Sequence, residues 1–136
     1  MARLPVKVFI ADDSAQLTEA LSELVTDPGN VEVVGAADSA DKAIEGIDRL
    51  KPDVVIVDLQ FKDGSGFDVI KAIRSSPDCS NTLLVLFTNH MSREFHNHAA
   101  ELGADFFFDK SRDHAKILDL IREKVSQRAG RIRHAH

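Results

Sequence analysis

The residues of this sequence that are best suited to chemistry each follow an apolar run of the chain. They are three carboxylates, one hydroxyl and one ammonium: Asp12, Asp13, Asp58, Thr88 and Lys110. The clearest case is Asp58, which comes directly after four β-branched residues, Val54–Val57. A run of that kind is typical of a strand buried on both faces. A carboxylate at the mouth of such a strand loses hydration, which costs free energy unless another group compensates its charge.

Apolar runs alternate with amphipathic segments five times along the chain, and we expect them to be strands and helices. The expected strands are Val6–Ala11, Val31–Ala37, Val54–Val57, residues 83–87 and residues 104–108. This alternation predicts an α/β fold with a doubly wound, five-stranded parallel sheet of order 2-1-3-4-5, the flavodoxin-like (βα)5 arrangement. Glu32 interrupts the second apolar run, which places that strand at an edge.

The helical segments carry apolar residues at the spacing of one helix face. The fourth segment is the most polar, and its apolar stripe is thin: Phe95, Ala99 and Leu102. Three serines are the expected N-caps: Ser14, Ser39 and Ser111. The one cysteine, Cys79, lies in a turn-like stretch and is expected to be a surface thiol.

The expected strand order brings the polar residues together. Ligands of such sheets bind outside the carboxyl ends of the strands, here between strands one and three. Three carboxylates at that place repel one another, so they either take up protons or bind a cation. Mg²⁺ prefers oxygen ligands and leaves positions for a substrate phosphate. We expect Asp13, and more distantly Asp12, to hold Mg²⁺ beside Asp58, with the backbone carbonyl of Gln60 completing the protein ligands.

This arrangement suggests phosphoryl transfer. A carboxylate can attack phosphorus and form an aspartyl phosphate, and Asp58 is central enough to be that nucleophile. Such a transfer depends mainly on neutralising charge around the phosphoryl oxygens. The neutralising groups would be Mg²⁺, Lys110, the Thr88 hydroxyl and the backbone N–H of Asn89.

Four motifs in this order resemble the receiver domain of two-component response regulators. They are FIADDS (9–14), VVIVDLQFKDGSG (54–66), LFTNH (86–90) and GADFFFDKS (103–111), and the likeness extends over about residues 5–126. The resemblance implies that Asp58 is the phosphoacceptor and that Asp12 and Asp13 are the acidic pair for Mg²⁺. It also implies that Thr88 is the switch hydroxyl, that Lys110 binds the phosphate and that Phe107 is the switch aromatic.

Several positions depart from the pattern of that family. Phe61 and Lys62 replace a frequent Met-Pro pair, and Ser111 replaces the usual proline, which leaves the geometry of the Lys110–Ser111 peptide open. Three positions are expected to tune the reaction. Gln60 and His90 occupy two positions that set autodephosphorylation in the family, and Asn89 is expected to narrow phosphate access.

The whole chain is consistent with a signalling module. It has 136 residues and a net charge of -5, which argues against a direct nucleic-acid partner. No stretch is apolar enough for a membrane span, so a cytoplasmic protein is expected. We expect a receiver domain over residues 1–126, followed by a basic tail over residues 127–136. The tail is expected to be a solvated helix end, with docking to an acidic partner as the alternative.

The resemblance implies a histidine kinase or phosphotransfer protein as donor and an unknown downstream protein as target. It also implies a possible phosphorylation-dependent homodimer, and it argues against a turnover enzyme. The alternatives on the same fold are a flavodoxin-type FMN carrier, an aspartate-based phosphatase and a pseudo-receiver that binds partners without phosphorylation. A receiver cut from a longer DNA-binding regulator is a further alternative.

Overall fold

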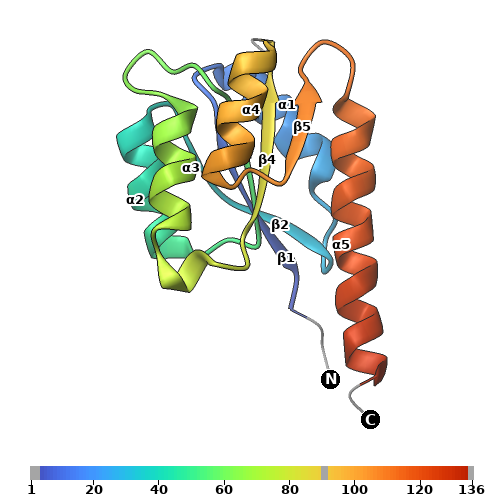
Figure 1. Ribbon diagram of the computed structural model, residues 1–136. Coiled ribbons are helices and arrows are strands. Elements are labelled where there is room, and N and C mark those ends of the chain that lie inside the picture. The colour runs from blue at the N-terminus through green and yellow to red at the C-terminus, as the bar shows by residue number, and fades with distance from the viewer. Residues whose placement is uncertain (1–3, 90–91, 135–136) are drawn as a thin grey trace.

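A parallel sheet of five strands, flanked by helices, forms the centre of the protein (Figure 1). The computed structural model describes residues 4–89 and 92–134. The strands are β1 Val6–Ala11, β2 Val31–Ala37, β3 Val54–Val57, β4 Leu83–Thr88 and β5 Phe106–Asp109. The helices are α1 Ala15–Val25, α2 Ala40–Leu50, α3 Gly66–Arg74, α4 Arg93–Leu102 and α5 His114–His134, with a short 3-10 helix, η1, at Pro77–Cys79. The strand order is β2-β1-β3-β4-β5, which confirms the predicted fold and the edge position of β2.

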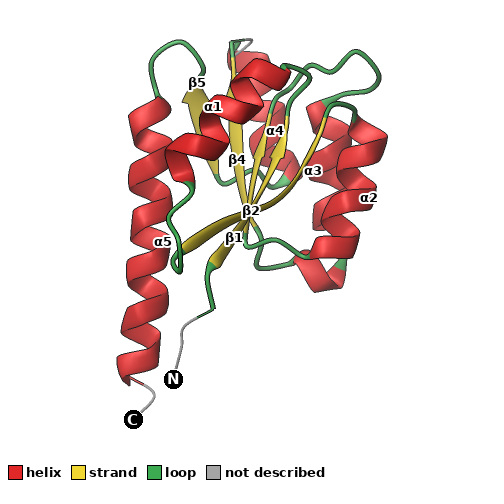
Figure 2. Cartoon of the chain, turned by 180° about the vertical axis from the view of Figure 1, so that it is seen from behind, coloured by secondary structure: helices red, strands yellow, loops and turns green. Residues whose placement is uncertain are grey.

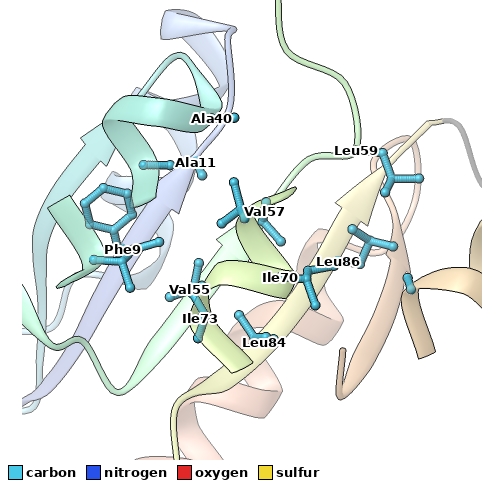
Figure 3. Close-up of a cluster of buried hydrophobic side chains, with 14 of the residues drawn as sticks. Phe9, Ala11, Ala40, Val55, Val57, Leu59, Ile70, Ile73, Leu84 and Leu86 are labelled. Carbon is cyan, nitrogen blue, oxygen red and sulfur yellow. The ribbon is translucent and has the colours of Figure 1, made fainter. Parts of the chain in front are cut away.

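Each face of the sheet carries its own apolar core, because side chains alternate between the faces along a strand. One core lies under α2, α3 and α4, where Phe9, Val55 and Leu86 are buried (Figure 3). The other lies under α1 and α5, on the side seen in Figure 2. In β5, Phe107 packs toward the first core and Phe108 toward the second, as the alternation predicts. β3 is buried at all four positions, and this burial fixes where Asp58 emerges.

Two of the three predicted N-caps are confirmed, and the third is wrong. Ser14 and Ser39 accept backbone N–H groups in the first turns of α1 and α2. Ser111 caps no helix, because α5 begins only at His114. The N–H of Ser111 instead donates to the Asp109 carboxylate at 2.7 Å, within the turn that joins β5 to α5. The Asp113 carbonyl accepts the N–H groups of Lys116 and Ile117 in the first turn of the helix.

Two apolar residues lie at a different depth than predicted. Cys79 is wrongly predicted as a surface thiol: it ends η1, which turns the side chain into the core between α2 and α3, and it is 2% exposed. Phe95, predicted as part of the buried stripe of α4, is 39% exposed, and Ala99 is the buried residue of that helix. β5 begins at Phe106 rather than at residue 104, because Ala104 still bonds back to the end of α4.

α5 continues through residue 134, so the described part of the basic tail is helical. Arg128 anchors this part of the tail to the end of the sheet opposite the acidic cluster. Its guanidinium donates to the Pro5 carbonyl at 2.8 Å and pairs with Asp53 at 2.9 Å. The domain boundary after residue 126 stays a prediction. Within the described residues, no helix has both the length and the apolar character that a membrane crossing requires.

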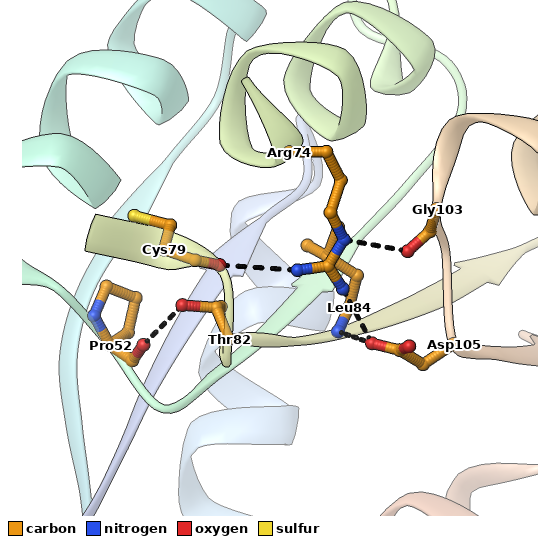
Figure 4. Close-up of polar contacts among 7 residues, drawn as sticks. All are labelled: Pro52, Arg74, Cys79, Thr82, Leu84, Gly103 and Asp105. Carbon is orange, nitrogen blue, oxygen red and sulfur yellow. Dashed lines mark hydrogen bonds and ion pairs between the residues drawn. The ribbon is translucent and has the colours of Figure 1, made fainter. Parts of the chain in front are cut away.

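Arg74, the last residue of α3, joins three segments through one guanidinium group (Figure 4). Its Nε donates to the Gly103 carbonyl at 2.9 Å, at the end of α4. One terminal nitrogen donates to the Cys79 carbonyl, and the other pairs with Asp105 at 2.8 Å. Asp105 also accepts the N–H of Leu84 at the start of β4. The group therefore holds α3, η1, α4 and the entry to β5 in one arrangement.

Arg74→Ala is expected to lower the free energy of unfolding by about 2–3 kcal/mol, because two carbonyls lose their side-chain donor and Asp105 loses its ion-pair partner and keeps only the N–H of Leu84. Urea unfolding followed by circular dichroism measures this loss. Lys71→Ala is the matched control, since Lys71 is an exposed cation on the same helix. Its expected change is below about 0.5 kcal/mol. Equal losses in the two variants would show that the Arg74 contacts add nothing to stability.

Candidate functional site

The carboxyl ends of β1, β3 and β4 bring the predicted site residues together. Asp12 and Asp58 are buried, at 5% and 6% exposure, and Thr88 is fully buried at the end of β4. Asp13 is more open to solvent. One carboxylate oxygen from each of Asp12, Asp13 and Asp58 lies within 4.8 Å of the other two. The structure thus confirms the predicted convergence of the three acids.

Lys110 supplies the positive charge at this edge. Its Nζ lies 2.6 Å from Asp12 Oδ2 and 2.7 Å from Asp58 Oδ2, and the lysine side chain is 14% exposed. Burial lowers the pKa of Lys110, but its hydrogen bonds and charge interactions with the two carboxylates outweigh burial and raise the pKa overall. The lysine therefore stays charged and bridges β1 and β3.

Asp12 is held in a fixed orientation by a second donor. Its Oδ1 accepts the N–H of Ser14 at 2.8 Å, just before α1. Burial raises the pKa of Asp12 above its ordinary value, although the Lys110 and Ser14 hydrogen bonds act in the opposite direction. A cation beside this carboxylate would stabilise its charged form.

The second oxygen of Asp58 has a different environment from the one that Lys110 binds. Asp58 Oδ1 is buried and has no hydrogen-bond partner among the described residues. Three carboxylates here face one ammonium, so negative charge is in excess. A hard divalent cation compensates such an excess and binds oxygen ligands. The donor set and the unpaired oxygen therefore fit the predicted Mg²⁺.

The remaining predicted residues surround this centre. The Thr88 carbonyl accepts the N–H of Lys110 at 3.2 Å, which fixes the register between the ends of β4 and β5. Gln60 is exposed and pairs with Ser65 across the loop after β3. Asn89 is exposed, and His90 lies outside the described residues. The tuning roles of all three stay predictions.

Phe107 has a neighbour that sequence reasoning missed. The ring of His96, on α4, lies 4.0 Å from the Phe107 ring, centroid to centroid. The sequence carries no signal for this pair, because the two residues lie eleven positions apart in different elements, α4 and β5. The peptide between Lys110 and Ser111, whose geometry the sequence left open, is not cis, and the structure has no cis peptide within its described residues.

Comparison with known proteins agrees with the fold and the geometry of the site. The family model described as "Response regulator receiver domain" matches residues 8–122. The chain belongs to this family. A protein-glutamate methylesterase/protein-glutamine glutaminase of Idiomarina loihiensis is 31% identical, over 94% of this chain and 36% of the relative. The response regulator protein VraR of Staphylococcus saprophyticus is 27% identical, over 88% of this chain and 56% of the relative.

Solved receiver structures superpose closely on this chain. The signal receiver domain of the putative response regulator NarL from Mycobacterium tuberculosis has a TM-score of 0.79 and 27% identity, and the match covers 90% of this chain and 97% of that one. The receiver (REC) domain of AraT from Geobacillus stearothermophilus has a TM-score of 0.73 and 27% identity, with 99% and 98% covered. This receiver chain spans 36% and 56% of the two curated relatives above, so their whole activities do not transfer to it. Family membership decides against the FMN carrier and the aspartate-based phosphatase.

Proposed function

We propose that this receiver domain takes a phosphoryl group onto Asp58 with the help of Mg²⁺ and signals through contacts with other proteins. The observation that carries the proposal is the pairing of Asp58. One of its oxygens is held by Lys110, and the other is buried without a partner beside two further carboxylates. A carboxylate that is paired through one oxygen only leaves the other oxygen available to react with phosphorus.

In the proposed reaction an oxygen of Asp58 bonds to phosphorus as the bond between phosphorus and the donor breaks. The electron pair of that bond leaves with the donor, and Asp58 becomes an acyl phosphate. Mg²⁺ would neutralise charge on the phosphoryl oxygens. Its protein ligands would be Asp12, Asp13, Asp58 and the Gln60 carbonyl. Lys110 and the Thr88 hydroxyl would bind the same phosphoryl oxygens, because phosphoryl transfer depends on charge neutralisation and positioning.

The new charge at Asp58 is the signal in this proposal. Thr88 and the loop that follows β4 would draw toward the phosphoryl group. Phe107 would repack with them, which would change the face formed by α4, β5 and α5. Because Phe107 has no hydroxyl group, its switching would act through packing alone, and His96 is the ring it packs against.

The proposed partners follow from this reaction. The donor would be a histidine kinase or a phosphotransfer protein, and the target a downstream protein, with a phosphorylation-dependent homodimer as one form of output. The net charge of -5 favours protein partners over direct nucleic-acid binding, and we place the protein in the cytoplasm.

The test is to incubate the protein with Mg²⁺ and acetyl phosphate and to weigh the intact chain. The expected result is a gain of one phosphoryl group, absent without Mg²⁺ and absent in Asp58→Asn. Asparagine keeps the shape of the side chain and removes the nucleophilic charge. A chain that gains no phosphoryl group, or an Asp58→Asn variant that gains one, would reject the proposal in favour of a pseudo-receiver or another acceptor.

A further inference from the structure

The loop between β3 and α3 carries the predicted metal ligand Gln60 and is closed at its base. The N–H of Gly66 donates to the Leu59 carbonyl at 2.8 Å. Gln60 and Ser65 pair in antiparallel fashion just inside that bond. Residues 59–65, here called the β3–α3 loop, therefore form a compact unit whose placement sets the position of the Gln60 carbonyl.

The first turn of α2 holds the tip of this loop. The N–H of Ala40 has no acceptor within its own helix, as is usual in a first turn, and it donates to the Asp63 carbonyl at 3.2 Å. Gly64 lies against the same residue: a Cβ at Gly64 would be 2.6 Å from the Cβ of Ala40. No side chain therefore fits at position 64 unless α2 or the loop moves.

Burial anchors the loop on both sides of Gln60. Leu59 and Phe61 are buried in the same apolar cluster as Ala40, at 3%, 9% and 3% exposure. Figure 3 shows Leu59 and Ala40 at the upper edge of that cluster. Phe61 thus anchors the position where the family often has methionine, and the exposed residues Gln60 and Lys62 flank it.

α2 also connects to the other half of the acidic site. The N–H of Asp12 donates to the Ala37 carbonyl at the end of β2, at 3.0 Å. Only Asp38 and the N-cap Ser39 separate Ala37 from Ala40. The segment from Ala37 to Ala40 therefore bonds to Asp12 at one end and to the β3–α3 loop at the other.

We propose that the contact between Ala40 and Gly64 positions the β3–α3 loop for Mg²⁺ binding and phosphoryl transfer at Asp58. Ala40 and Gly64 are then positioning residues, which act through the loop and touch neither metal nor phosphate. The inference rests on the proposed function, because it assigns these residues to the Mg²⁺ and phosphoryl site. It predicts that one added methyl group at position 64 weakens metal binding without altering any ligand.

The matched variants are Gly64→Ala and Gly29→Ala. Both glycines have a positive φ, of +92° and +85°, so alanine costs backbone strain at either position. A Cβ at Gly29 meets nothing within 4 Å, whereas a Cβ at Gly64 meets Ala40. The chain has no tryptophan or tyrosine, so Mg²⁺ affinity is measured by isothermal titration calorimetry. The lifetime of the acyl phosphate is followed by intact mass after the donor is removed.

Gly64→Ala is expected to weaken Mg²⁺ binding by on the order of tenfold, as the loss of outer-shell support does at metal sites. Gly29→Ala, which carries the backbone strain without the clash, is expected to lose less melting temperature and to leave the Mg²⁺ affinity unchanged. Adding Ala40→Gly to Gly64→Ala removes the opposing methyl group and is expected to restore part of the affinity. If Gly64→Ala does not fold, Ala40→Gly alone replaces it, because it removes the methyl group that Gly64 packs against and adds no strain at position 64, and it is likewise expected to weaken Mg²⁺ binding.

Equal Mg²⁺ affinities for the Gly64 and Gly29 variants would overturn the inference. So would a double variant that recovers no affinity, or a wild type that binds no Mg²⁺. A wild type that binds Mg²⁺ but takes up no phosphoryl group would refute the proposed function instead. In that case the Mg²⁺ titrations still decide whether α2 positions the loop.

Discussion

Lys110→Met is expected to lower the free energy of unfolding of the Mg²⁺-free protein by about 3–5 kcal/mol, the usual cost of removing one partner from a buried ion pair. The lysine contacts both Asp12 and Asp58, at 2.6 Å and 2.7 Å. Methionine fills a similar volume but leaves three carboxylates with no ammonium beside them. Urea unfolding followed by circular dichroism, at pH 7.5 and in the presence of a chelator, measures the change.

Mg²⁺ and pH should both modulate this loss. Saturating Mg²⁺ is expected to restore much of the stability, because the cation supplies the missing positive charge. Removing Lys110 also removes a hydrogen bond that lowers the pKa of Asp12, a group whose pKa burial already raises. The folded variant then binds protons more tightly than the unfolded chain, so its stability falls as the pH rises. The deficit is expected to be small in acid and to grow toward neutral pH.

Lys116→Met is the control for this prediction. Lys116 pairs with Asp113 at 3.3 Å, but its side chain is 64% exposed. Solvent screens such a pair, so the expected loss is below about 1 kcal/mol and independent of Mg²⁺. If the two lysine variants lose equal stability, or if Mg²⁺ leaves the Lys110→Met deficit unchanged, the ammonium is not the main compensation for the acidic cluster.

The convergence of the site residues was predictable because the strands carry strong signals. Val54–Val57 is buried at every position, as its uninterrupted β-branched run indicates. A parallel sheet then brings the ends of such strands to one edge, which places Asp12, Asp58 and Lys110 together without any knowledge of side-chain contacts. The residue types and their order along the chain were therefore sufficient to predict the cluster.

Other features depend on tertiary contacts that have no local signature. Asp109, Ser111 and Asp113 all offer side-chain acceptors near the start of α5, and such groups compete for nearby N–H groups. The structure has α5 begin after Asp113, so the predicted cap at Ser111 is wrong. Cys79 lies in a turn-like sequence, yet η1 turns it into the core. The contact of Ala40 with Gly64 joins residues 24 positions apart, and neither residue type predicts it.

Gly66→Ala is expected to cause the largest steric disruption at the site. A Cβ at Gly66 would lie 2.1 Å from the backbone carbonyl oxygen of Asp58 and 2.9 Å from the Cα of Leu59. Both neighbours are backbone atoms, so no side-chain rotation can relieve the clash, and either α3 or the end of β3 must move. The expected loss in the free energy of unfolding is about 3 kcal/mol or more, at the upper end of the range for overpacked sites.

Displacement of the Asp58 backbone is also expected to slow phosphoryl uptake. A shift of about 1 Å in a reacting group can slow a reaction by on the order of a hundredfold, so the rate of phosphoryl uptake on Asp58 is expected to fall by one to two orders of magnitude. Intact-mass time courses with acetyl phosphate measure that rate at a temperature where the variant is folded. Gly46→Ala is the control, because a Cβ there meets only the end of the Phe9 side chain, at 2.9 Å. Phosphoryl uptake at the wild-type rate in folded Gly66→Ala would mean that the Asp58 backbone tolerates displacement, and that side-chain contacts alone, above all with Lys110, orient the nucleophile.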